Sequence, residues 1–169
     1  VIATTESPLD DLMHHVTIRK SGWHGRVITA YRPDNVVDPD AVGFIDNLKR
    51  FSELTGEDAL SWRGYLAAHR KRRAFFAVMG ATSTDHGHPT ARTADLSPAD
   101  AEALFQRVAS GRQNPGDAEL FRGQMLTEMA RMSLDDGMVL QIHPGVFRSH
   151  NPLLLQRFGR DKGADIPEA

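Results

Sequence analysis

The sequence contains no cysteine among its 169 residues. This absence excludes a disulfide framework, a thiolate metal site and a cysteine nucleophile. The chain also lacks an apolar run near the roughly 18 residues that a membrane helix needs, and its start shows no signal-peptide pattern. The formal net charge is only −2, so the overall charge favours neither nucleic acid nor an anionic membrane. We therefore expect a cytoplasmic protein that has no nucleic-acid or membrane partner.

Short apolar segments that end in polar residues alternate with helical patterns along the chain. The predicted strands cover residues 1–5, 26–31, 81–85 and 138–142. The predicted helices begin at Ser7-Pro8, Asp38-Pro39, Asp58, Ser97-Pro98 and Asp117, and the first four end near Gly22, Gly56, Gly80 and Gly111. Such alternation predicts parallel strands joined by right-handed crossovers.

An open doubly wound sheet and part of a (β/α)8 barrel both satisfy this order. An open sheet of this class normally has a glycine-rich phosphate loop after the first strand, but residues 5–8 (TESP) contain no glycine. The absence favours an α/β fold that forms part of a (β/α)8 TIM-type barrel, with about four βα units and helical insertions. A whole barrel needs about 250 residues and eight strands.

We interpret residues 1–169 as a single segment of a barrel domain. The sequence opens on a strand without an initiator methionine and closes on a loop, residues 161–169, which indicates an interior fragment of a longer chain. A partial barrel leaves strand edges unpaired, and unpaired edges favour association. The isolated chain is therefore expected to self-associate or aggregate, and a homo-oligomer is expected.

Polar side chains lie at the ends of the predicted strands, and in a parallel β/α protein these ends share the face that holds the active site. Asp85 ends its strand and is a candidate acid, base or hydroxyl acceptor. His143 follows the strand 138–142 directly and is a candidate catalytic residue. Arg32 and Arg148 can each bind a carboxylate or phosphate with two hydrogen bonds. The set suits an anionic, hydroxyl-rich substrate.

Each candidate also has a structural interpretation. Arg32 could pair with the nearby Asp34, and His143 could bond a neighbouring backbone group. His86 and His88 form an H-x-H pair of the kind that can bind a metal, but they lie past the strand end, where loop histidines are more often exposed. We predict no metal site at this pair.

Two further patterns are assigned to structure. Residues 69–73 (HRKRR) place five titratable side chains in a row on a predicted helix. Such a run points all round a helix axis and no aromatic pattern accompanies it, so a solvated face is predicted rather than a nucleic-acid site. Met125, Met129 and Met132 have near-helical spacing and are predicted to lie in the core.

Four segments together resemble the uronate isomerases, also called glucuronate isomerases, of the amidohydrolase superfamily. They are residues 4–12 (TTESPLDDL), 30–36 (AYRPDNV), 83–87 (STDHG) and 138–151 (MVLQIHPGVFRSHN). The segments occur in the family's order and span almost the whole chain. Family members typically have Asp-Asp-Pro after the paired threonines, where this chain has Glu6-Ser7-Pro8.

The resemblance implies a (β/α)8 barrel that isomerises hexuronic acids by proton transfer between C2 and C1. The typical reactions convert D-glucuronate to D-fructuronate and D-galacturonate to D-tagaturonate. It implies that Arg32 and Arg148 hold the carboxylate and hydroxyls of the sugar acid. It also implies that His143 contacts the hydroxyl or carbonyl end of the sugar and that Asp85 lies in the sugar pocket. His143 and Asp85 are therefore the expected catalytic residues, and both are expected to bind the substrate together with His86.

The resemblance further implies a divalent metal, with zinc expected, in the complete enzyme. The family's metal ligands, its tyrosine and its proton-transferring aspartate lie outside the present sequence, so no metal is expected in this chain alone and the chain alone should be inactive. Two alternatives stay open: a metal-dependent hydrolase on the same fold, and a non-enzymatic chain that only binds a partner. The two arginines near strand ends suit a carboxylated substrate, which weighs against the hydrolase. The polar groups gathered on one predicted face weigh against a non-enzymatic chain, which would not need them.

Overall fold

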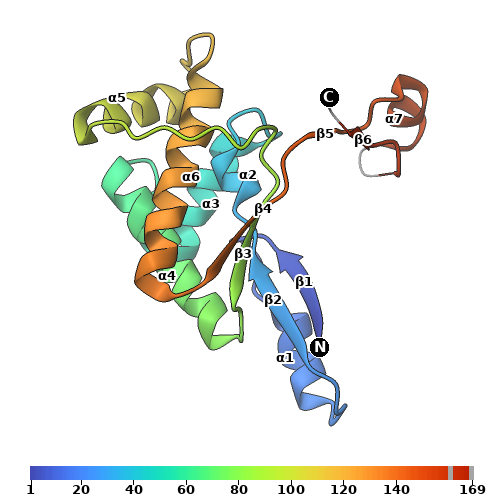
Figure 1. Ribbon diagram of the computed structural model, residues 1–169. Helices are drawn as coiled ribbons and strands as arrows, with labels where there is room; N and C mark the ends of the chain where they lie inside the picture. The colour runs from blue at the N-terminus through green and yellow to red at the C-terminus, as the bar shows by residue number, and fades with distance from the viewer. Residues whose placement is uncertain (160–161, 168–169) are drawn as a thin grey trace.

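A four-stranded parallel sheet lies at the centre of the computed structural model, which describes residues 1–159 and 162–167 (Figure 1). The strands lie in the order β1-β2-β3-β4, so neighbours in space are also consecutive along the chain. Their bounds confirm the four predicted strands to within two residues: β1 (Ile2–Glu6), β2 (Val27–Tyr31), β3 (Ser83–His86) and β4 (Val139–Ile142). All three strand pairs are parallel, as the alternation with helices predicts.

Six helices connect these strands and cover one face of the sheet. They are α1 (Met13–Lys20), α2 (Asp34–Val37), α3 (Phe44–Thr55), α4 (Trp62–Val78), α5 (Pro98–Ala109) and α6 (Asp117–Asp136). Helices α1 and α4 contact β2, while α6 contacts β4. Helices α3 and α5 pack outside α4 and α6, so the helical side is more than one layer deep (Figure 1).

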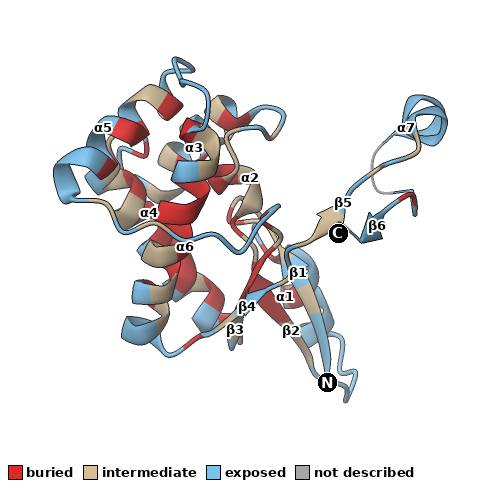
Figure 2. Ribbon diagram, turned by 45° about the horizontal axis from the view of Figure 1, so that its top comes forward, coloured by how far each residue is buried: buried red, intermediate tan, exposed pale blue. Residues whose placement is uncertain are grey.

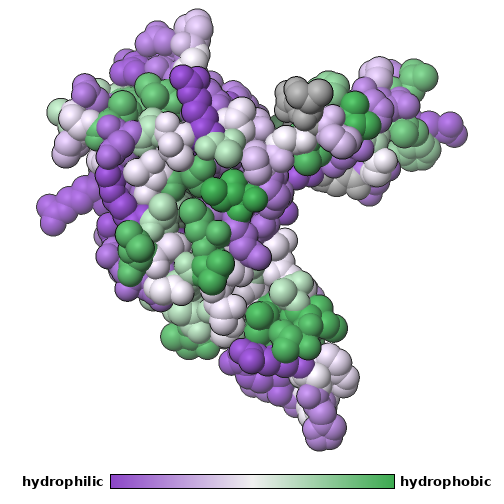
Figure 3. Space-filling view, viewed as in Figure 1, coloured by the Kyte–Doolittle hydropathy of each residue, from purple (hydrophilic) through white to green (hydrophobic). Residues whose placement is uncertain are grey.

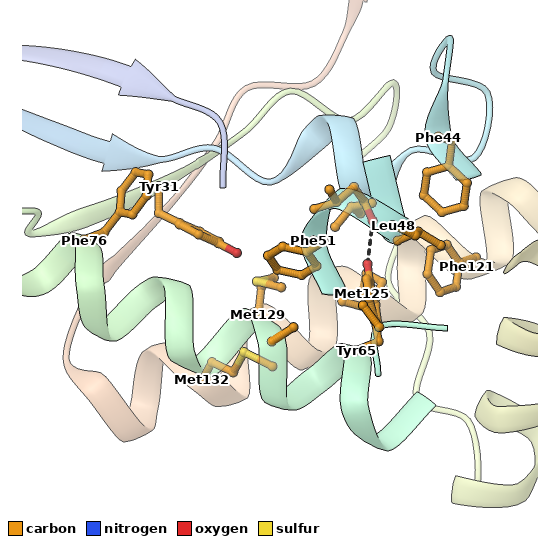
Figure 4. Close-up of a cluster of buried hydrophobic side chains, with 14 of the residues drawn as sticks. Tyr31, Phe44, Leu48, Phe51, Tyr65, Phe76, Phe121, Met125, Met129 and Met132 are labelled. Atoms are coloured by element: carbon orange, nitrogen blue, oxygen red, sulfur yellow. Dashed lines mark hydrogen bonds between the residues drawn. The ribbon is translucent and has the colours of Figure 1, made fainter. Parts of the chain in front are cut away.

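The core lies between the sheet and helices α3 to α6, where Figure 2 shows most of the buried residues. Tyr31 projects from β2 into this core and packs edge-on against Phe76 of α4, with ring centroids 5.1 Å apart (Figure 4). Tyr65 donates a hydrogen bond to the Val36 carbonyl at 2.8 Å, which ties α4 to α2. The predicted burial of Met125, Met129 and Met132 is confirmed.

The prediction of a solvated face for residues 69–73 is wrong for three of the five side chains. Arg70 and Lys71 are exposed, but His69, Arg72 and Arg73 are buried. These three residues have the i, i+3, i+4 spacing of one helix face, and they continue the buried stripe of α4. Arg72 donates to the backbone carbonyls of Pro8 and Asp10, Arg73 donates to Asp136, and His69 Nδ1 lies 2.7 Å from the Tyr31 hydroxyl. These partners reduce the cost of removing the charged and polar groups from water.

Two helices begin later than the proline signals predict. The helix expected at Ser7-Pro8 starts at Met13, because the Ser7 hydroxyl instead accepts the Leu9 amide in a turn. Leu12, just before the helix, has a left-handed backbone with φ 57°. The helix expected at Asp38-Pro39 starts at Phe44, after a turn. Helical spacing also predicts that Met13, Val42, Leu54 and Leu120 belong to apolar helix faces, but these four side chains are exposed, at 53%, 87%, 44% and 39%.

Residues after β4 form an arm that extends away from the sheet (Figure 1). It contains the antiparallel pair β5 (Val146–Phe147) and β6 (Ile166–Pro167), with α7 (Pro152–Phe158) between them. The sequence predicts mostly loop over residues 147–169, with a turn of helix at 152–158. Helix α7 confirms the helical turn, whereas β5 and β6 correct the prediction of loop. Residues 160, 161, 168 and 169 of that predicted loop lie outside the described part of the chain.

Most of the arm is exposed, including apolar side chains on α7 such as Leu153 and Phe158 (Figure 2). The hydropathy view in Figure 3 shows further hydrophobic side chains at the surface over the middle of the molecule. Exposed apolar residues also lie on both edge strands, with Ile2 on β1 and Val139 on β4. No helix within residues 1–159 and 162–167 has both the length and the apolar character that crossing a membrane requires.

Candidate functional site

The register of the sheet places Arg32, Asp85 and His143 on one face. Tyr31 is aligned with Thr84, so Arg32 continues the chain beside Asp85, and Asp85 is aligned with Gln141, two residues before His143. Side chains alternate between the faces of a strand. Tyr31 and Thr84 point into the helix-covered core, and the three site residues therefore belong to the opposite face, at the carboxyl ends of β2, β3 and β4.

Asp85 lies between the other two side chains and contacts both. His143 Nε2 is 3.1 Å from Asp85 Oδ1 and 3.2 Å from Oδ2, and Arg32 Nε is 3.5 Å from Oδ2. A carboxylate only accepts hydrogen bonds, so this contact places the imidazole proton on Nε2. The Asp85 side chain is 13% exposed, against 40% for His143, so the imidazole is the more accessible of the two.

Arg32 also forms the ion pair that the sequence left open as an alternative. Its Nε donates to Asp34 Oδ2 at 2.9 Å. Among the residues that the structure describes, neither terminal nitrogen of the guanidinium has a hydrogen-bonding partner in the protein. The side chain remains 31% exposed. The pairing to Asp34 is therefore compatible with binding an anionic ligand through the two terminal nitrogens.

His86 and His88 are not exposed loop histidines, so that expectation is wrong. His86 is fully buried and lies on the helix-covered face with Thr84, whose hydroxyl is 2.9 Å from His86 Nε2. His88 is only 4% exposed, and the two ring centroids are 5.6 Å apart. Burial, assisted by the neighbouring His88, lowers the pKa of His86 to about 3, so its ring is neutral at pH 7. The structure thus places His86 on the face opposite Asp85.

Arg148 lies at the end of β5 on the arm, and its Nη1 is 3.3 Å from Asp165 Oδ2. The structure does not join it to the cluster of Arg32, Asp85 and His143. Figure 1 shows β5 on the arm, away from the four-stranded sheet whose strand ends carry that cluster.

A second polar group at a strand end was not singled out from the sequence. Glu6 ends β1, and its carboxylate accepts hydrogen bonds from the Thr29 hydroxyl and from His15 Nε2, the latter at 3.0 Å. Burial raises the pKa of Glu6, but these hydrogen bonds outweigh the burial and hold its pKa below the usual value. This group fastens β1 to β2 and α1, so its evident role is structural.

The described residues do not fit a metal site. Within 1–159 and 162–167, no group of three or more histidine or carboxylate side chains is placed to hold an ion. His86 and His88 have no third ligand beside them among these residues, and His86 Nε2 lies 2.9 Å from the Thr84 hydroxyl. Asp85 contacts Arg32 and His143, both through nitrogen atoms.

Four consecutive parallel strands, helices on the outer face and a charged cluster at the strand carboxyl ends define a segment of a β/α-barrel protein. Residues 1–168 match the family model described as glucuronate isomerase. The chain therefore belongs to the glucuronate isomerase family, and the predicted resemblance is confirmed.

Curated relatives agree with this assignment. The chain is 68% identical over 167 residues to the uronate isomerase of Xanthomonas campestris pv. campestris, covering 99% of this chain and 36% of the relative. It is 70% identical over 173 residues to the uronate isomerase of Sphingopyxis alaskensis, covering 100% of this chain and 37% of the relative. The chain thus spans about a third of the length of the relatives it matches.

Solved structures show the same fold. The crystal structure of glucuronate isomerase from Caulobacter crescentus matches with a TM-score of 0.93 and 60% identity, over 99% of this chain and 35% of that one. The uronate isomerase structure from Thermotoga maritima matches with a TM-score of 0.90 at 24% identity, over 98% of this chain and 37% of that one. The predicted α/β fold, part of a TIM-type barrel, is confirmed by these matches.

Proposed function

We propose that this chain is a segment of a barrel enzyme that interconverts the aldose and ketose forms of hexuronic acids. The substrates are D-glucuronate, giving D-fructuronate, and D-galacturonate, giving D-tagaturonate. The observation that carries the proposal is the convergence of Arg32, Asp85 and His143 at three neighbouring strand ends in a chain of the glucuronate isomerase family. A segment of a third of the relatives' length is expected to be inactive alone.

The proposed reaction moves a proton between C2 and C1 through an enediol or enediolate. It needs a base, a group that polarises the carbonyl oxygen, and a binding group for the distant carboxylate. Arg32 supplies the binding group with its two terminal nitrogens, which suit the two oxygens of a carboxylate. His143, held by Asp85, contacts a hydroxyl or the carbonyl at the reacting end.

Asp85 orients His143 and accepts a sugar hydroxyl in this scheme. The predicted contacts of Arg148 and His86 with substrate stay predictions, since Arg148 lies on the arm and His86 is bonded to Thr84. The residues that act as base belong to parts of the family barrel outside this chain. A divalent metal, with zinc expected, is proposed for the complete enzyme only, and its ligands likewise lie elsewhere; metal analysis of the full-length protein tests this.

Proton NMR of the full-length protein with D-glucuronate or D-galacturonate in D2O tests the function. Signals of the corresponding ketose support isomerisation, and their deuterium content reports how far the transferred proton exchanges with solvent. No turnover of either acid would overturn the proposal and revive the alternative of a hydrolase on the same fold. The same preparation shows by its sedimentation whether the protein is the expected homo-oligomer, and cell fractionation tests the expected cytoplasmic location.

A further inference from the structure

Asp34 joins two of the strand ends that build the site. It is the first residue of α2, three positions after the end of β2. Its Oδ2 accepts the Arg32 Nε–H at 2.9 Å, and the Gly87 amide lies 3.2 Å from each carboxylate oxygen. One carboxylate therefore connects the segment after β2 to the segment after β3, across 53 residues of sequence.

The fit around this carboxylate depends on the glycine. A Cβ at position 87 would lie 2.6 Å from Arg32 Nη2, 2.7 Å from Asp34 Oδ2 and 3.1 Å from His143 Cε1. The first two distances are shorter than any ordinary contact of a side-chain carbon, so only glycine lets the three side chains approach so closely. Gly87 is thus the point at which Arg32, Asp34 and His143 pack together.

The contact with Asp34 also determines which part of Arg32 can meet a ligand. A guanidinium has five N–H donors, of which the Nε–H is used here. The terminal nitrogens remain, and they can bind a carboxylate end-on with two parallel hydrogen bonds. An arginine held at Nε loses less rotamer freedom when it binds than one that must be ordered by the ligand.

From this geometry we infer that Asp34 is a positioning residue: it holds Arg32 by its Nε so that both terminal nitrogens face the carboxylate of the sugar acid. The inference rests on the proposed function for the identity of the ligand. The contact of Asp34 with Arg32 and Gly87 stands on the structure alone. Asp34 does not touch the substrate in this scheme and acts only through Arg32.

The first experiment needs no activity. Asp34→Asn and Asp34→Ala are prepared in the full-length protein, and exchange of the Arg32 Nε–H with water is measured by NMR on protein labelled with 15N at arginine. The Arg32 signal is identified by its loss in Arg32→Lys. We expect exchange to quicken at least tenfold in both variants, because each removes the nearer carboxylate, at 2.9 Å, and leaves Nε facing Asp85 Oδ2 at 3.5 Å. Unchanged exchange would overturn the inference, whether or not the protein isomerises uronates.

The second experiment measures kcat and KM for D-glucuronate in the same variants. We expect kcat/KM to fall about tenfold to hundredfold, mainly through KM, in line with the loss of a charge-assisted hydrogen bond. Asp34→Asn keeps an acceptor for the Gly87 amide but loses the charge. If Asp34 serves only to hold the Gly87 turn, Asp34→Asn should behave like the parent protein, and that result would also overturn the inference.

Asp46→Asn is the matched control. This carboxylate is 78% exposed and pairs with Lys49 on its own helix, at 2.9 Å. It should change neither the exchange of Arg32 nor the kinetics. A parent protein that does not turn over uronates would disprove the proposed function, while the exchange measurement would still decide whether Asp34 holds Arg32.

Discussion

Two arginines on opposite faces of the same sheet differ in how completely they are bound. Arg73, on the helix-covered side, is 1% exposed and uses every nitrogen: it binds Asp136 with two hydrogen bonds of 2.6 and 2.9 Å, and also contacts Ser133 and Met129. Arg32, at the strand ends, is 31% exposed and binds the described protein only through Nε. A fully bound guanidinium stabilises the fold, whereas one with free terminal nitrogens remains available to a ligand.

The surroundings of the two arginines differ in the same way, since Arg73 lies among buried groups and Arg32 among partly exposed ones. Arg73 lies 5.9 Å from the ring of Tyr31, whose hydroxyl is 2.7 Å from His69 Nδ1. Burial lowers the pKa of His69 well below its usual value, so this ring is neutral beside the buried cation. Around Arg32, by contrast, two carboxylates and an accessible imidazole face a surface that only the rest of a barrel would enclose.

The largest effect on stability is expected from Arg73→Ala. Removing one partner of a buried ion pair leaves Asp136 without its counter-charge, and the free energy of unfolding should fall by about 3 kcal/mol. Arg70→Ala, at an exposed position on the same helix, is the control and should change it by less than about 0.5 kcal/mol. Urea denaturation followed by circular dichroism measures both. Equal effects at the two positions would contradict a structural role for Arg73.

A smaller loss is expected from Tyr31→Phe. The change removes the hydroxyl from His69 Nδ1 and leaves a fully buried imidazole without that partner. The free energy of unfolding should fall by about 1–2 kcal/mol, the cost of an unsatisfied buried polar group. The same urea measurement checks this, and a variant as stable as the parent would show that the hydrogen bond does not support the core.

A fall in pH should lower the free energy of unfolding through the protonation of His86. Its pKa is about 3 when folded and 6.5 in an unfolded chain, so between these values the unfolded state binds more protons. The contribution of neutral His86 to the free energy of unfolding is therefore fully present above pH 6.5 and is lost progressively as the pH falls towards 3. A drop from pH 6.5 to 5.5 should lower the free energy of unfolding by about 1 kcal/mol for this residue.

Urea denaturation at a series of pH values measures this slope. His86→Gln should flatten it, while His14→Gln, at an exposed position, should leave it unchanged. The buried rings of His69 and His88 titrate in the same direction, so part of the slope persists in His86→Gln. A slope identical to that of the parent would contradict the neutral, buried state of His86.

The smallest effect on stability, and the sharpest contrast, is expected from Arg32→Lys. The side chain is partly exposed and lysine keeps the charge, so the free energy of unfolding should change by less than about 0.5 kcal/mol. Lysine has no fork to bind a carboxylate, however, and kcat/KM for uronates in the full-length protein should fall about a hundredfold. Arg26→Lys, at an exposed position, is the control. Unchanged kinetics would show that Arg32 does not bind the carboxylate of the substrate.

Local patterns explain which features could be predicted. The alternation of strands and helices along the chain and the polar strand ends follow from apolar periodicity and from glycine and proline, which act over a few residues. The burial of His69, Arg72 and Arg73 also had a local signal, since their spacing continues the stripe that begins at Tyr65. That signal was outweighed by their charge, because charged residues are rarely buried unless they are paired.

The sequence by itself determined the parallel β/α architecture, the family and the strand-end positions of Arg32, Asp85 and His143. Only the tertiary structure decided that Arg73 would meet Asp136, 63 residues away, and that Asp34 would reach Gly87. The reason is physical: periodicity is a property of neighbours in the chain, whereas the partner that makes a buried charge tolerable comes from a distant element brought close by folding.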